Sequence, residues 1–65
     1  MQNQLTTTEI SILCFIAKGL KNKEIAKELK ISPSTVKSHI ENIFRKLEVR
    51  NRLQVAIYAA QNNLV

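Results

Sequence analysis

The stretch from Ser32 to Leu47 decides the fold and reads SPSTVKSHIENIFRKL. Its first two residues are typical of a helix start. The Ser32 hydroxyl can accept a hydrogen bond from the free N–H groups of the first turn, and Pro33 stands where a backbone N–H would have no partner anyway. At 100° per residue the apolar side chains fall within about 60° of one another; they are Val36, Ile40, Ile43 and Leu47. The opposite side carries Ser34, Lys37, Ser38, Glu41 and Arg45. We therefore expect a helix over 33–47 with one buried face, and an outer face whose size and chemistry suit a DNA major groove.

Three further helices are expected around this one. Thr6 and Glu9 form a capping-box pattern that predicts a helix over about 7–18, ended by Gly19. Asn22 and Asn51 are predicted N-caps. They would start helices over about 23–29 and 52–62.

The connection between the second and third helices is the shortest in the chain. Only Lys30 and Ile31 separate the second helix from Ser32. So few residues permit only a tight turn, and the two helices must cross steeply. The sequence predicts an all-α, four-helix, bundle-like domain that contains a helix-turn-helix.

Composition limits the function classes. The 65 residues predict one domain over 5–65, with residues 1–4 as a linker or tail. One cysteine and one histidine allow neither an internal disulfide nor a four-ligand zinc site. With no paired carboxylate or Gly-rich phosphate loop, we expect no catalytic residues, no metal and no cofactor. The absence of an apolar run near 18 residues and of a signal peptide predicts a cytoplasmic protein without membrane contact. A net charge of +5 favours a polyanionic partner.

Spaced residues along most of the chain carry a family resemblance. They are Leu5-Thr6, Glu9, Gly19-Leu20, Asn22-Lys23-Glu24-Ile25-Ala26, Leu29, Ile31-Ser32, Thr35-Val36-Lys37, His39-Ile40, Ile43, Lys46-Leu47 and Asn51-Arg52. This pattern resembles the LuxR/GerE-type (LuxR/FixJ/NarL family) DNA-binding domain of bacterial transcription regulators. The resemblance implies double-stranded DNA as partner, with a receiver or sensory domain and RNA polymerase as possible further partners. The family often has Arg and Gly where this chain has Thr8 and Glu48. Glu48 then stands where the chain needs a positive φ.

The resemblance assigns roles to the outer face of the third helix. Lys37, Ser38, Glu41 and Asn42 are expected to contact base edges, with lysine suited to guanine and asparagine to adenine. An acid in an anionic groove is costly unless Glu41 accepts from a cytosine N4 amine or pairs with Arg45 four residues on, and of these two we expect the intrahelical pair. The residues expected to contact the DNA backbone are Asn22, Lys23, Ser34, Thr35, His39, Arg45 and Lys46.

The first and last helices have more apolar side chains than one packing face can absorb. By resemblance, the surplus on the last helix is a homodimer contact through Val55, Tyr58 and Ala59. On the first helix, Ile10 and Cys14 could form an apolar patch for a sensory domain, or pack against the N-terminal tail or the last helix.

The predicted function is sequence-specific DNA binding as a dimer that regulates bacterial transcription. The chain would be the output domain of a response regulator or a ligand-sensing regulator. Two alternatives stay open. One is a free-standing small regulator of the same type, and the other is a protein-interaction module whose basic face and last helix bind an acidic or apolar protein surface instead of DNA.

Overall fold

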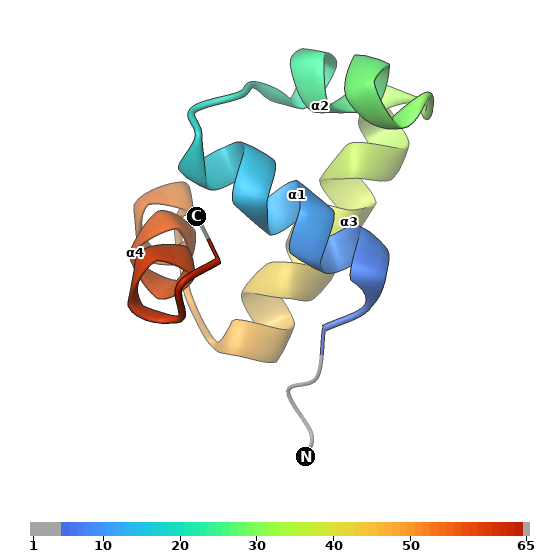
Figure 1. Cartoon of the computed structure of the whole chain (residues 1–65). Coiled ribbons are helices and arrows are strands. Elements are labelled where there is room, and N and C mark those ends of the chain that lie inside the picture. The colour runs from blue at the N-terminus through green and yellow to red at the C-terminus, as the bar shows by residue number, and fades with distance from the viewer. Residues whose placement is uncertain (1–4, 65) are drawn as a thin grey trace.

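Four α-helices make up the fold in the computed structural model, which describes residues 5–64. They are α1 (Thr7–Ala17), α2 (Asn22–Leu29), α3 (Pro33–Leu47) and α4 (Arg52–Gln61) (Figure 1). The predicted all-α class is confirmed, and each predicted helix lies within one residue of its observed bounds. The predicted linker at residues 1–4 lies outside the described residues.

Three of the four predicted helix starts have the expected cap. Thr6 and Glu9 form the full capping box, in which the Thr6 N–H donates to Glu9 Oε1 at 2.9 Å and the Glu9 N–H donates to Thr6 Oγ1 at 3.1 Å. Ser32 Oγ accepts from the Thr35 N–H at 3.1 Å, and Asn51 Oδ1 accepts from the Gln54 N–H at 2.9 Å. These side chains pair N–H groups that a helix start leaves without partners.

The predicted cap of the second helix is wrong. Lys21 is the N-cap of α2, and Asn22 is the first helical residue. A lysine ammonium cannot accept a hydrogen bond, so α2 starts without a side-chain cap. Glu24 Oε1 instead accepts from the Lys21 N–H at 2.7 Å. The side-chain amide of Asn22 is therefore not used as a cap and can contact another part of the chain.

All four described helices end in the same way. Each is followed by a residue with positive φ, at Gly19, Lys30, Glu48 and Asn63. The next residue is apolar, and its N–H donates to the carbonyl five residues earlier; these residues are Leu20, Ile31, Val49 and Leu64. All four pack partly buried against the core. This is the Schellman arrangement with its apolar contact, and it turns the chain sharply after every helix.

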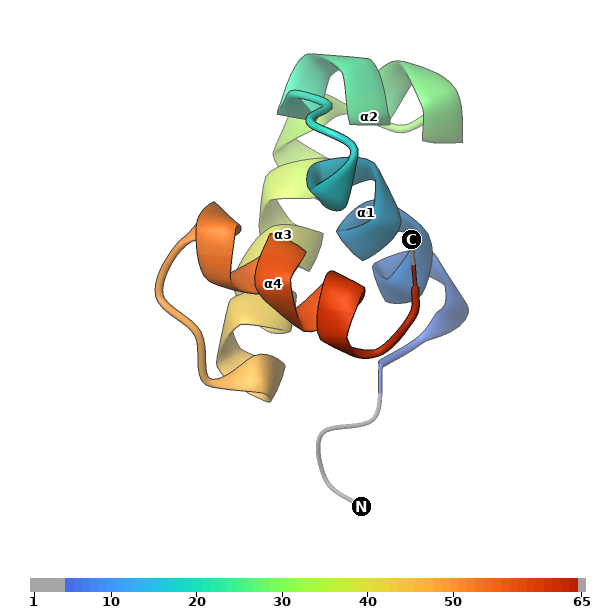
Figure 2. The same ribbon diagram turned by 60° about the vertical axis from the view of Figure 1, so that its left-hand side comes forward.

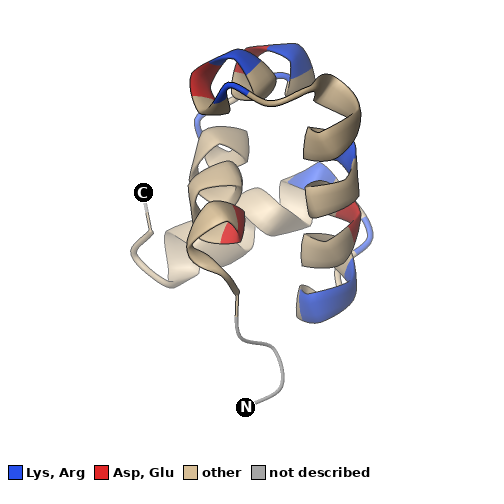
Figure 3. Ribbon diagram, turned by 90° about the vertical axis from the view of Figure 1, so that its right-hand side faces the viewer, with Lys and Arg blue, Asp and Glu red and all other residues tan. Residues whose placement is uncertain are grey.

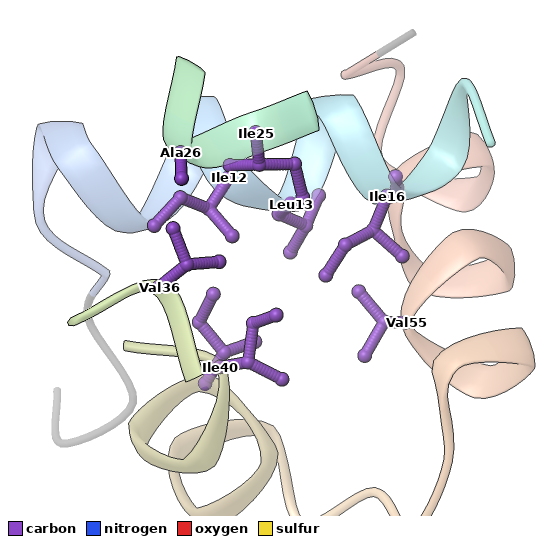
Figure 4. Close-up of a cluster of buried hydrophobic side chains, with 10 residues drawn as sticks. Ile12, Leu13, Ile16, Ile25, Ala26, Val36, Ile40 and Val55 are labelled. Atoms are coloured by element: carbon purple, nitrogen blue, oxygen red, sulfur yellow. The ribbon is translucent and has the colours of Figure 1, made fainter. Parts of the chain in front are cut away.

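A single core joins the four helices. Its fully or nearly fully buried members are Ile12, Leu13, Ile16, Ile25, Ala26, Val36, Ile40, Ile43, Val55 and Ala59 (Figure 4). α1 packs on both α3 and α4, while α2 packs on α3. The three-residue connection of Lys30, Ile31 and Ser32 makes α3 leave α2 at a steep angle, as predicted (Figures 1 and 2).

The left-handed Glu48 gives a stability prediction. An L-residue in this conformation costs about 1 kcal/mol, which glycine avoids at some cost in unfolded-state entropy. We expect Glu48→Gly to stabilise the domain by up to about 1 kcal/mol in urea denaturation. Lys27→Gly, at an exposed position inside α2, is the control and should destabilise by about 1 kcal/mol. Equal losses in both variants would contradict strain at Glu48.

Candidate nucleic-acid interface

The polar face of α3 lies opposite its buried face. Val36, Ile40 and Ile43 fix the helix in the core. On the other side, Ser34, Thr35, Lys37, Ser38, Glu41 and Arg45 are exposed, and His39, Asn42 and Lys46 are half-buried. Lys37, Ser38 and Glu41 therefore share a surface that a ligand could reach without unpacking the helix.

Hydrogen bonds order both ends of this face. At the start of α3, the Ser32 hydroxyl lies 2.8 Å from Thr35 Oγ1 and 3.2 Å from Ser34 Oγ. Farther along the helix, Arg45 Nη1 donates to Asn42 Oδ1 at 2.9 Å. The expected Glu41–Arg45 pair is therefore wrong, because the guanidinium turns to Asn42 instead.

Lys46 points into the domain. Its Nζ donates to Glu9 Oε1 at 2.7 Å, joining the end of α3 to the start of α1. Glu9 is only 4% exposed. A buried carboxylate needs a counter-charge, so the first role of Lys46 is structural, which is at odds with its expected place among the DNA-backbone contacts.

The environment of Glu9 favours its charged form. Burial by itself raises the pKa of the Glu9 carboxyl, but hydrogen bonds from Lys46 and the Thr6 backbone, together with the Lys46 charge, lower the pKa below its ordinary value of 4.5. The folded state thus binds fewer protons at Glu9 than the unfolded chain does. Its contribution to stability is complete above the ordinary pKa and is lost as the pH falls through the folded pKa.

The start of α2 presents free donors next to a lysine. Within residues 5–64, no acceptor pairs with the backbone N–H groups of Asn22, Lys23 and Glu24. Lys23 is exposed beside them. The Asn22 side chain accepts from Arg52 at 2.8 Å and is half-buried. Backbone donors and a flexible ammonium are suited to a phosphate oxygen.

Charged side chains lie mainly on one part of the molecule. Figure 3 shows Lys and Arg concentrated on α2 and α3 and on the segments beside them, while α4 has one charged residue, Arg52. Residues 5–64 hold no group of three or more His, Cys, Asp or Glu that could bind a metal ion. No described helix has the length and apolarity to cross a membrane.

The outer surface of α4 differs from the expected one. Val55 and Ala59 are 0% exposed and face α1, and Tyr58 is half-buried. Val55 and Ala59 cannot contact a second molecule without unfolding, so their predicted place in a dimer interface is wrong. Leu53 and Ile57 are 68% and 47% exposed and are the large apolar residues that α4 leaves outside.

Cys14 also has a partner within the chain. Its thiol donates to the Leu64 carbonyl at 3.1 Å, and the residue is half-buried. Of the two interpretations of the Ile10–Cys14 pair, packing within the domain is the one that fits Cys14, although its partner is Leu64, which follows α4, and not α4 itself. Ile10 is 38% exposed.

Comparison with known proteins identifies the family. Residues 3–59 match the family described as bacterial regulatory proteins, luxR family. The chain belongs to this family.

Two luxR-family relatives give the scale of the similarity. The chain is 56% identical over 61 residues to the transcriptional regulatory protein LiaR of Bacillus subtilis (strain 168), covering 94% of this chain and 29% of LiaR. It is 49% identical over 65 residues to the response regulator protein VraR of Staphylococcus aureus (strain NCTC 8325 / PS 47), covering 100% of this chain and 31% of VraR. The chain thus spans less than a third of either relative.

Three features of the site were not predicted from the sequence. The Glu9–Lys46 pair joins residues 37 positions apart and the Arg52–Asn22 bond joins residues 30 apart, so no local pattern indicates either. The exposure of Leu53 and Ile57 was missed for another reason. α4 is apolar around most of its circumference, so its spacing fits a buried pair Leu53/Ile57 as well as Val55/Ala59.

The Glu9–Lys46 pair generates a stability prediction. Lys46→Ala leaves the buried carboxylate of Glu9 without its counter-charge, which costs several kcal/mol in a fully buried pair. Because the Lys46 side chain is about a third exposed, water screens part of this effect, and we expect a loss of about 2 kcal/mol. Lys37→Ala removes an exposed lysine from the same helix and should change stability by less than about 0.5 kcal/mol. Urea denaturation at pH 7 measures both.

A pH series adds an independent check of the same pair. The wild type should have a higher free energy of unfolding than Glu9→Gln at pH 7. This difference should shrink as the pH falls below 4.5, because the carboxylate is then protonated. If the difference in the free energy of unfolding stays constant down to pH 3, the charge of Glu9 contributes nothing to stability.

Proposed function

We propose that this chain binds double-stranded DNA sequence-specifically, with α3 in the major groove. The observation that carries the proposal is the exposed row of Lys37, Ser38 and Glu41 on a helix fixed from behind by the core. A helix of this size fits the major groove, where each base pair presents a distinct set of donors and acceptors. Membership of the luxR family supports the same function.

The geometry suggests how base edges are read. Lys37 donates to guanine O6 and N7. Glu41 is not engaged by Arg45, so its carboxylate is available to accept from a cytosine N4 amine. Arg45 engages Asn42 Oδ1, which leaves the Asn42 amide group to act mainly as a donor.

The start of α2 and the start of α3 bind the phosphate backbone in this proposal. Lys23 and the free N–H groups beside it face one phosphate, and Ser34, Thr35 and His39 reach others. Such contacts fix the orientation of the domain and carry no sequence information.

A second copy of the chain pairs through the exposed side of α4. Leu53 and Ile57 lie one turn apart and are both exposed. One short helix offers much less than the roughly 800 Å² per partner of a standard interface, so pairing forms mainly on DNA. Two-fold pairing places the half-sites about 10 base pairs apart.

The regulatory setting follows from the relatives. LiaR is a transcriptional regulatory protein, VraR is a response regulator, and the chain spans less than a third of either. We infer that this domain is the DNA-binding output of a transcription regulator of the response-regulator kind, controlled by a receiver domain. Selection of bound sequences from a random duplex pool tests the core of the proposal, and a two-fold symmetric consensus is expected.

Base and phosphate contacts can be separated by mutation. We expect Lys37→Ala to lose about 1 to 3 kcal/mol on the selected site and little on random DNA. Lys23→Ala should weaken binding to all duplexes alike and lower the slope of log affinity against log salt by roughly one. Equal losses of Lys37→Ala on both DNAs would contradict its assignment, and a flat salt dependence of the wild type would favour the protein-interaction alternative.

The two faces of α4 predict opposite outcomes. Leu53→Asp and Ile57→Asp should leave helicity intact and abolish cooperative binding to a full site while half-site binding persists. Val55→Asp places a charge at a fully buried position and should unfold a domain whose total stability is about 3 to 10 kcal/mol. Circular dichroism and binding curves on full and half sites measure these effects. An unchanged full-site curve in both outer-face variants would exclude α4 as the interface.

A further inference from the structure

The Arg52 guanidinium joins the first residue of α4 to the start of α2. Nη1 donates to Asn22 Oδ1 and Nη2 donates to the Leu20 carbonyl, each at 2.8 Å. The residue is half-buried. A planar guanidinium holds two acceptors in a fixed relation, which a single ammonium cannot do. Arg52 therefore fixes two points of the chain at once.

These two points lie on either side of Lys21. Leu20 is the apolar residue of the turn that ends α1, and Asn22 is the first residue of α2. Lys21 between them has an extended backbone and supplies no side-chain cap. Within α2, Glu24 Oε1 holds this start by accepting from the Lys21 N–H at 2.7 Å. From outside the helix, Arg52 supplies a contact to both neighbours of Lys21.

The same arginine belongs to the helix proposed to pair two copies. α4 packs mainly on α1, and its exposed residue Leu53 directly follows Arg52. The guanidinium is a direct polar link from α4 to α2, the helix that carries Lys23.

We propose that Arg52 is a positioning residue for DNA binding. It holds the first turn of α2 in register with α4, so that the phosphate contact at Lys23 and the pairing surface of α4 move as one unit. Arg52 itself does not contact DNA. This inference rests on the proposed DNA-binding function and goes beyond it, by giving a half-buried arginine of α4 control over the phosphate contact at Lys23.

Arg52→Lys and Arg52→Gln test the proposal together. Lysine keeps the charge but loses the two-pronged geometry, so both variants should lose about tenfold in duplex affinity. In both, the salt slope should fall by roughly one, because the Lys23 contact is lost. Adding Lys23→Ala to either variant should cause no further loss. Arg50→Gln, which removes an exposed arginine two residues earlier, is the matched control and should retain affinity within about twofold.

Amide hydrogen exchange provides a readout that does not need DNA. The Ile25 N–H donates to the Lys21 carbonyl at 2.9 Å and closes the first turn of α2. It should exchange faster in both Arg52 variants, whereas the Ile10 N–H, which donates to the Thr6 carbonyl and closes the first turn of α1, should keep its rate. A general loss of stability would accelerate both amides and would overturn a positioning role.

Two results of the affinity measurements would overturn the positioning role of Arg52. Wild-type affinity in Arg52→Lys would show that charge alone suffices, and full additivity with Lys23→Ala would show an independent phosphate contact. Either result overturns the inference while leaving the proposed function intact. Failure of the wild type to bind any duplex would instead reject the proposed function itself.

Discussion

The burial of α1 against its neighbours is the constraint on which the rest of this small domain depends. Ile12 and Leu13 are fully buried, and the helix packs on both α3 and α4. A chain of 65 residues has room for only one core, so each other helix must give an apolar side to it. This requirement puts Val55 and Ala59 inside and leaves Leu53 and Ile57 to the surface. It also orients α3 with its polar row outward.

The repeated helix ending determines how the helices are arranged. After each helix one residue adopts positive φ and the following apolar side chain returns to the core. Three of these four residues are not glycine, which carries a conformational cost at each position. The apolar contact and the satisfied carbonyl offset that cost. Between α2 and α3 this geometry makes the turn of the helix-turn-helix, so the crossing of these helices follows from local packing.

Not all of the positive charge serves the proposed interface. Lys46 pairs with Glu9, Arg52 bonds to Asn22 and Leu20, and Arg45 bonds to Asn42. The first two stabilise contacts between helices, and the third orders a side chain on the polar face. The net charge of +5 thus overstates the charge available to a phosphate backbone. Lys23 and Lys37 remain exposed and without such partners among residues 5–64.

The sequence by itself determined the four helices, three of their caps and the polar face of α3, because capping bonds and helical periodicity act over three or four residues. It also indicated the left-handed residue at Glu48 and the family. Only the tertiary structure decided which side of α4 is buried, since a helix apolar around most of its surface has no periodicity to choose by. The tertiary structure likewise paired Lys46 with Glu9 and Arg52 with Asn22, turning two apparent surface cations into internal contacts. Such pairs join residues far apart in the chain, and their partners are set by how helices pack, which no local pattern encodes.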